Sequence, residues 1–170
     1  MNKKFLVIFF SAIILSTPLF SASNGSSEVK GQYQVTDSKA RKISNYKIAV
    51  KRILKAKKFE KKGKTDKAKI LYEEAYSRLI EANREKPIDP DILNYMGFTS
   101  LKLGNLEDAE IYYLLGLDQN PNHIGLNEYL GELYVQTNRI DKAKERLKIL
   151  EGCDCKEFDE LQTSIKLGTP

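Results

Sequence analysis

Two cysteines separated by a single residue are the side chains best suited to covalent chemistry. Cys153 and Cys155 are the only cysteines among the 170 residues, so a bond between them leaves no thiol over. Three interpretations stay open: a structural disulfide that tightens a turn, a labile redox pair, and a soft-metal site for Cu(I) or Zn that takes further ligands from another molecule. Cys155 also precedes an expected helix, whose positive end would stabilise its thiolate.

The single histidine, His123, is the other side chain with catalytic potential. It follows Pro121 in a turn between two apolar runs, and no second histidine accompanies it. We therefore expect a solvated turn residue. The chain also lacks a Gly-rich phosphate loop, a Gly-x-Ser-x-Gly elbow and a His-Glu-x-x-His helix, so we expect no enzymatic activity and no cofactor.

The elements that position these residues are helices, and the clearest pair lies at residues 90–121. Asp89 can accept hydrogen bonds from the backbone amides of a helix start, and Pro90 suits the first helical position. Gly104 interrupts this helix, and a second apolar stripe continues until Pro121. Three small residues, Gly97, Ala109 and Gly116, would let the two helices approach closely. Three large ones, Leu93, Met96 and Tyr113, would fill the remaining space.

This segment resembles the tetratricopeptide repeat (TPR), a 34-residue helical hairpin. The matching features are Met96-Gly97, Gly104, Ala109, Tyr113 and Pro121, whereas Ser100 and Gly116 depart from the pattern. A shift of 34 residues gives a second match at Leu130-Gly131, Tyr134, Asn138, Ala143 and Leu147. A weaker match precedes both at Ala56, Phe59, Gly63, Ala68, Tyr72 and Ala75.

The resemblance implies an all-α TPR solenoid of three helical hairpins plus a C-terminal capping helix. We expect the TPR domain over residues 38–170, with repeats at about 49–87, 90–123 and 124–155 and the cap helix at 156–167. Asp154 and Glu157 have the spacing of a capping box at the start of that last helix.

In this family the concave groove is lined by fixed positions of the first helices. In the second repeat these positions hold Asp91, Asn94, Phe98, Leu101 and Lys102, and in the third Gly125, Glu128, Glu132, Val135 and Gln136. The weaker first repeat adds Val50, Ile53, Lys57, Glu60 and Lys61. The resemblance therefore implies a peptide-binding groove of mixed charge with Phe98 and Leu101 exposed; packing of these two against the cap or a neighbouring helix is the alternative.

The chaperone-binding branch of the family clamps a C-terminal carboxylate with Lys, Asn and Arg side chains at set groove positions. Here those positions hold Ile53, Lys57, Tyr95, Gly125 and Tyr129. The clamp is absent, so the resemblance does not extend to the binding of chaperone tails.

The first 23 residues have the pattern of a secretory signal peptide. Two lysines precede an apolar run at residues 5–15, which is too short to be interpreted first as a membrane span. We expect residues 24–37 to be a disordered linker and the protein to be periplasmic or secreted; a membrane anchor formed by an uncleaved signal is the alternative. An oxidising compartment would favour the structural disulfide.

Charge is distributed unevenly along the chain. Twelve bases and one acid lie between Lys39 and Lys64, whereas thirteen bases face twenty acids from Thr65 onward. The basic first helix is interpreted either as a solvated flank or as a surface attracted to an anionic membrane. We do not expect nucleic acid as a partner, because export separates the two and few aromatic residues interleave with the lysines.

These features predict an exported TPR adaptor or scaffold that mediates protein–protein interactions by binding a peptide segment in its groove. The alternative is a thiol redox or soft-metal-binding protein based on Cys153 and Cys155. The groove residues indicate polarity but do not identify the protein partner.

Overall fold

The computed structural model describes the backbone of residues 38–169 and the side chains of residues 45–169. The expected signal peptide and linker lie outside this part of the chain. The described residues form seven helices and no strand, which confirms the all-α expectation. The helices are α1 (Ser38–Glu60), α2 (Thr65–Glu85), α3 (Pro90–Lys102), α4 (Leu106–Gln119), α5 (Ile124–Gln136), α6 (Ile140–Ile149) and α7 (Lys156–Leu167). None of these helices is long and apolar enough to cross a membrane.

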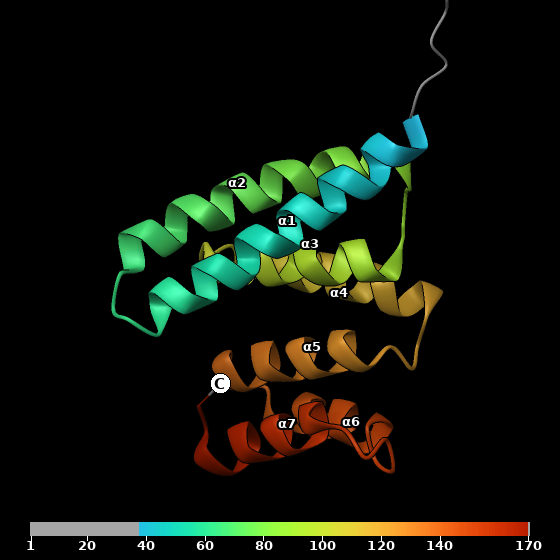
Figure 1. Cartoon of the computed structure of the whole chain (residues 1–170). Coiled ribbons are helices and arrows are strands. Elements are labelled where there is room, and N and C mark those ends of the chain that lie inside the picture. Colours follow the sequence, from blue (N-terminus) through green and yellow to red (C-terminus); the bar gives the residue numbers. More distant parts are fainter. Residues whose placement is uncertain (1–37, 170) are drawn as a thin grey trace, which may run out of the picture. The chain divides into compact units, whose positions relative to one another are not determined.

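Consecutive helices form hairpins that stack on one another. α1 packs along α2, α3 along α4 and α5 along α6, and the hairpins meet through α2 with α3 and α4 with α5. Figure 1 shows the three hairpins in succession, with α7 against the last one. Because α1 also contacts α3 and α3 contacts α5, the first helices of the hairpins share one side of the stack.

Glycines let neighbouring helices approach closely at two junctions. A Cβ atom on Gly116 of α4 would lie 2.6 Å from Cδ1 of Leu126 in α5, and one on Gly131 of α5 would lie 2.5 Å from Cδ2 of Leu161 in α7. Both leucines are fully buried. A larger residue at either glycine would therefore push a neighbouring helix away.

The helix ends follow local sequence signals. Asp89 caps α3 as expected, because its Oδ1 accepts a hydrogen bond from the Ile92 amide at 3.0 Å. The turn inside each hairpin has one left-handed residue, with φ of 67° at Gly63, 87° at Gly104 and 57° at Asn138. The three hairpins therefore share one turn geometry, although asparagine replaces glycine in the last.

The start of α7 differs from the expected capping box. Cys155 is the N-cap residue, not Asp154, and its side chain makes no capping hydrogen bond. Asp154 lies one residue earlier, in the turn, with a left-handed φ of 48°. The capping-box prediction for Asp154 and Glu157 was therefore wrong. Packing of Leu161 against Gly131 holds the helix in place instead.

Candidate functional site

A groove crosses the shared side of the first helices and continues onto α7. Its volume is about 630 Å³. The residues that line this groove are Lys57, Glu60, Lys61, Phe98, Leu101, Lys102, Glu128, Tyr129, Glu132, Gln136, Lys156 and Glu160. They come from α1, α3, α5 and α7 and from the turn after α1, so each hairpin contributes.

Aromatic rings form the floor of the groove. The Phe98 ring lies 5.1 Å from that of Tyr129, measured between centroids, and 5.9 Å from that of Tyr72 in an edge-on contact. Phe98 is only 3% exposed, so the expectation of an exposed Phe98 was wrong and the packing alternative holds. The covering ring, Tyr129, belongs to the next hairpin.

Lys57 lies over this aromatic floor. Its Nζ is 4.3 Å from the Phe98 ring centroid and donates a hydrogen bond to the Tyr129 hydroxyl at 3.2 Å. Burial lowers the pKa of Lys57. The ring faces and the hydroxyl stabilise the ammonium group in place of part of its water shell.

At the end of the groove near α2, acidic and basic groups balance each other. Glu60 accepts a hydrogen bond from the Tyr72 hydroxyl at 2.8 Å, and Lys102 Nζ lies 3.5 Å from the same carboxylate. Glu60 is thereby engaged on both oxygens. Lys61 has no ion pair with any described residue, so it adds an unbalanced positive charge at this end.

The opposite wall of the groove, formed by α5 and α7, carries a pair of acids that share a proton. Glu128 is 4% exposed and is hydrogen-bonded to Glu160. Burial, followed by this hydrogen bond and the charge of Glu132, raises the pKa of Glu128 to about 9. The same hydrogen bond lowers the pKa of Glu160, which also pairs with Lys156 at 3.2 Å. At neutral pH Glu128 therefore donates its proton to the Glu160 carboxylate.

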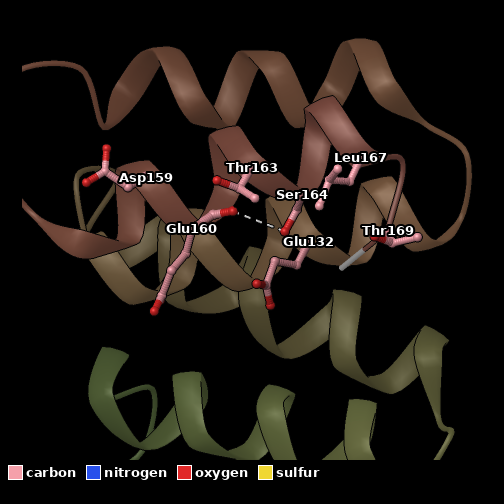
Figure 2. Close-up of a pocket in the computed structure, with 7 residues that line it drawn as sticks. All are labelled: Glu132, Asp159, Glu160, Thr163, Ser164, Leu167 and Thr169. Carbon is pink, nitrogen blue, oxygen red and sulfur yellow. Dashed lines mark hydrogen bonds between the residues drawn. The ribbon is translucent and has the colours of Figure 1, made fainter.

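Glu132 is the groove acid without a partner. Its carboxylate makes no hydrogen bond or ion pair with another described residue, and burial followed by the charge of Glu160 raises its pKa. It also lines an adjoining pocket of about 380 Å³, where Figure 2 shows the Glu132 and Glu160 side chains extending to the same side. The charges of Lys102, Lys57 and Lys156 act in the opposite direction on this pKa and favour the ionised form. The unpaired carboxylate oxygens can accept a hydrogen bond from a basic group of a ligand.

Six of the ten groove residues predicted for the second and third repeats lie together in the groove. These are Phe98, Leu101, Lys102, Glu128, Glu132 and Gln136, joined by Lys57, Glu60 and Lys61 of the weaker first repeat. Val135 instead lies in the core at 4% exposure, and Asn94 is 8% exposed beside Gly125. Asp91 does not line the groove either. Tyr129, which the repeat register placed at one of the clamp positions, also lines the groove. Sequence reasoning missed Lys156 and Glu160, because α7 lies outside the repeat pattern.

Asp91 and His123 interact at the junction between the second and third hairpins. His123 Nδ1 accepts a hydrogen bond from the Leu126 amide at 3.1 Å and so caps α5. Its Nε2 lies 3.1 Å from Asp91 Oδ1 and donates to that carboxylate when Nδ1 is the acceptor. The histidine side chain is 16% exposed, so the expectation of a solvated turn residue was wrong.

The two cysteines lie in the turn between α6 and α7. In the structure Cys153 and Cys155 form a disulfide, with Cα atoms 5.2 Å apart. Among the described residues, no group of three or more His, Cys, Asp and Glu side chains is placed to hold a metal ion. Neither cysteine lines the groove, although Cys155 directly precedes the groove residue Lys156.

The stacked hairpins, their common turn and the groove across their first helices define the chain as an all-α helical repeat with the TPR fold. Solved TPR structures are similar to it. The first TPR domain of human RPAP3 has a TM-score of 0.53 and 19% identity and covers 71% of this chain and 91% of its own. The first TPR of Spaghetti (RPAP3), bound to an HSP90 peptide, has a TM-score of 0.51 and 18% identity over 72% of this chain and 93% of its own.

A third similar structure is the second TPR domain of human RPAP3 in complex with an HSP70 peptide. Its TM-score is 0.53 and its identity 16%, over 74% of this chain and 98% of its own. No family model and no curated protein matches the sequence. At these identities the likeness establishes the fold.

Proposed function

We propose that this chain is a protein-interaction scaffold that binds a segment of a protein partner in the groove. The observation that carries the proposal is the groove itself, which all three hairpins and α7 build around the Phe98 and Tyr129 rings. An aromatic floor between charged walls suits a peptide with both apolar and charged side chains. We also propose that the chain is not an enzyme.

The similar structures support a peptide ligand without identifying it. Two of them are complexes with HSP90 and HSP70 peptides, both of which end in Glu-Glu-Val-Asp. In this chain Ile53 is 1% exposed at one of the clamp positions, and the Lys57 ammonium is engaged with Tyr129. We therefore propose a different peptide, one that places a basic side chain near Glu132.

A site-specific photo-crosslinker tests the groove. Placed at Gln136, on the exposed rim, it is expected to capture a partner segment in the cells that make the protein. The control position is Leu114 on α4, which is 47% exposed and does not line the groove. Crosslinks from Leu114 but not from Gln136 would contradict the proposal.

Binding of the identified segment then tests the chemistry of the groove. Glu132→Lys reverses the charge of the unpaired carboxylate, and we expect at least about tenfold weaker binding, equivalent to about 1.4 kcal/mol. Glu107→Lys, on the exposed surface of α4, is the matched control. Equal affinities of the two variants would argue against a basic group at Glu132.

The scaffold is proposed to act outside the cytoplasm, in the periplasm or after secretion. This proposal is supported by the two lysines and the apolar run at residues 5–15, a pattern typical of a secretory signal peptide. Sequencing the N-terminus of the protein recovered from cells tests it. A new N-terminus near residue 23 is expected; an intact N-terminus in the membrane fraction would favour the anchored alternative.

A second candidate function uses the disulfide between Cys153 and Cys155 as a redox pair. The observation that favours it is their position in an exposed turn outside the groove. Mass spectrometry with alkylation across a series of thiol buffers measures the reduction potential of the pair, and a Cu(I) titration of the reduced protein measures metal uptake. Resistance to reduction and absence of metal uptake would leave a structural bond.

A further inference from the structure

The outer face of α1 carries lysines that form no ion pair with a described residue, although Lys55 lies over the Phe59 ring. They recur at spacings of three and four residues, all of them are exposed, and they are Lys47, Lys51, Lys55, Lys58 and, in the following turn, Lys62. At 100° per residue the four on the helix fall within an arc of about 80°. This arc lies opposite the buried Ala49, Ile53 and Ala56. We call these five residues the lysine face.

No acid balances the lysine face. None of its members forms an ion pair with a described residue, whereas the neighbouring Arg52 pairs with Glu74 at 2.6 Å. Like charges at these spacings repel one another and destabilise the helix slightly. An external anionic surface would remove that repulsion and gain the attraction of all five charges at once.

The geometry points to an anionic lipid bilayer as the surface on which the lysine face docks. Leu54 is 56% exposed on the same side of the helix and offers an apolar side chain for the headgroup region. Ammonium groups are mobile point charges, which suit a fluid layer of headgroups better than bidentate recognition.

Nucleic acid fits the lysine face less well. Base stacking requires exposed aromatic rings, but Tyr46 and Phe59, the described aromatic residues of α1, pack against the hydrophobic core. The four helical lysines span about 16 Å along α1 at 1.5 Å per residue, an array that matches the surface of a bilayer. Lys57 turns into the groove instead, so a docked protein keeps its groove accessible.

Vesicle co-sedimentation of the full chain tests this docking. Vesicles of phosphatidylcholine are compared with vesicles that also contain phosphatidylglycerol. The N-terminal apolar run and the two lysines before it are the same in every variant, so differences between variants exclude their contribution. We expect stronger partition onto the anionic vesicles. The difference should disappear when salt rises from about 0.1 M to about 1 M, since the screening length falls from about 10 Å to 3 Å.

Charge-removing variants assign the effect to α1. Lys→Gln at all five positions of the lysine face should weaken anionic partition at least about tenfold, because each lysine near such a surface contributes about fivefold. Lys→Arg at the same positions should retain it. The matched control replaces five exposed lysines elsewhere by Gln: Lys69, Lys142, Lys144, Lys148 and Lys166.

Three results would overturn the inference. They are equal partition of the wild-type chain onto neutral and anionic vesicles, equal losses in the lysine-face and control variants, and displacement from anionic vesicles by a DNA oligonucleotide at lower concentration than the lipid. Circular dichroism and partner-peptide affinity, both expected to be unchanged in the Lys→Gln variant, separate a failure of docking from a failure of the groove.

Discussion

Gly97 in α3 faces Tyr113 in α4 so closely that a Cβ atom on Gly97 would lie 2.3 Å from Cε1 of the tyrosine ring. Tyr113 is fully buried, so its ring has no open space into which to move. The absence of a side chain at one position and the presence of a large ring at the other therefore set the distance between the two helices.

Gly97→Ala is expected to destabilise the protein by about 1 to 3 kcal/mol through overpacking. This loss is expected even though alanine gains up to about 1 kcal/mol over glycine in helix propensity. Urea unfolding measures the change. The control is the same substitution in a Tyr113→Leu background, where the ring is gone and the cost should fall; an unchanged cost would show that the ring is not its source.

The Tyr113 hydroxyl is buried without a hydrogen-bond partner among the described residues. Tyr113→Phe should therefore leave the free energy of unfolding unchanged or raise it by up to about 1 kcal/mol, since only a desolvation cost is removed. Tyr113→Ala should lower it by about 3 to 5 kcal/mol because a void remains. A marked loss in the phenylalanine variant would reveal a partner for the hydroxyl.

Burial and the hydrogen bond to Glu160 raise the pKa of Glu128 to about 9 in the folded protein, whereas the pKa of an unfolded glutamate is about 4.3. Its contribution to stability is therefore complete below about pH 4.3 and is lost as the pH rises towards 9. Glu128→Gln keeps a neutral donor for Glu160 and cannot ionise. We expect this variant to exceed wild type by about 1 to 3 kcal/mol near pH 8 and to match it near pH 4.

Urea unfolding of both proteins across this pH range measures the difference. Glu107→Gln, on an exposed position of α4, controls for the loss of one acid. A difference between wild type and Glu128→Gln that stays constant with pH would contradict the buried, protonated state of Glu128.

His123 can be replaced by residues that keep or lose its capping hydrogen bond. His123→Ala leaves the Leu126 amide without its acceptor, and we expect a loss of about 0.5 to 2 kcal/mol. Asparagine also accepts at this position, so His123→Asn should retain most of the stability. Thermal unfolding of the two variants is the measurement, and equal losses would show that the Asp91 contact dominates.

Local signals made most of the fold predictable from the sequence. Asp89 and Pro90 mark the start of α3, and Gly104 recurs as Asn138 after one repeat length, so the helices and turns follow from neighbouring residues. The packing of helices within each hairpin was also predictable, because small and large residues recur at the same positions of each repeat.

The groove was predicted less well because its surface depends on contacts between hairpins. Phe98 occupies a groove position, but a ring from the following hairpin, Tyr129, covers it. Val135 was assigned to the groove by register and lies in the core. Glu160 and Lys156 also line the groove but belong to α7. The repeat pattern does not predict where α7 lies, because its position depends on the packing of Leu161 against Gly131.

The bond between Cys153 and Cys155 joins residues only two apart in sequence. A ring this small restricts little more than its own turn and removes little freedom from the unfolded chain. The packing of Leu161 against Gly131 holds α7 in place, and with it the Glu160 carboxylate. Reduction of the disulfide should therefore leave α7 in place on the last hairpin, even though Cys155 directly precedes the groove residue Lys156.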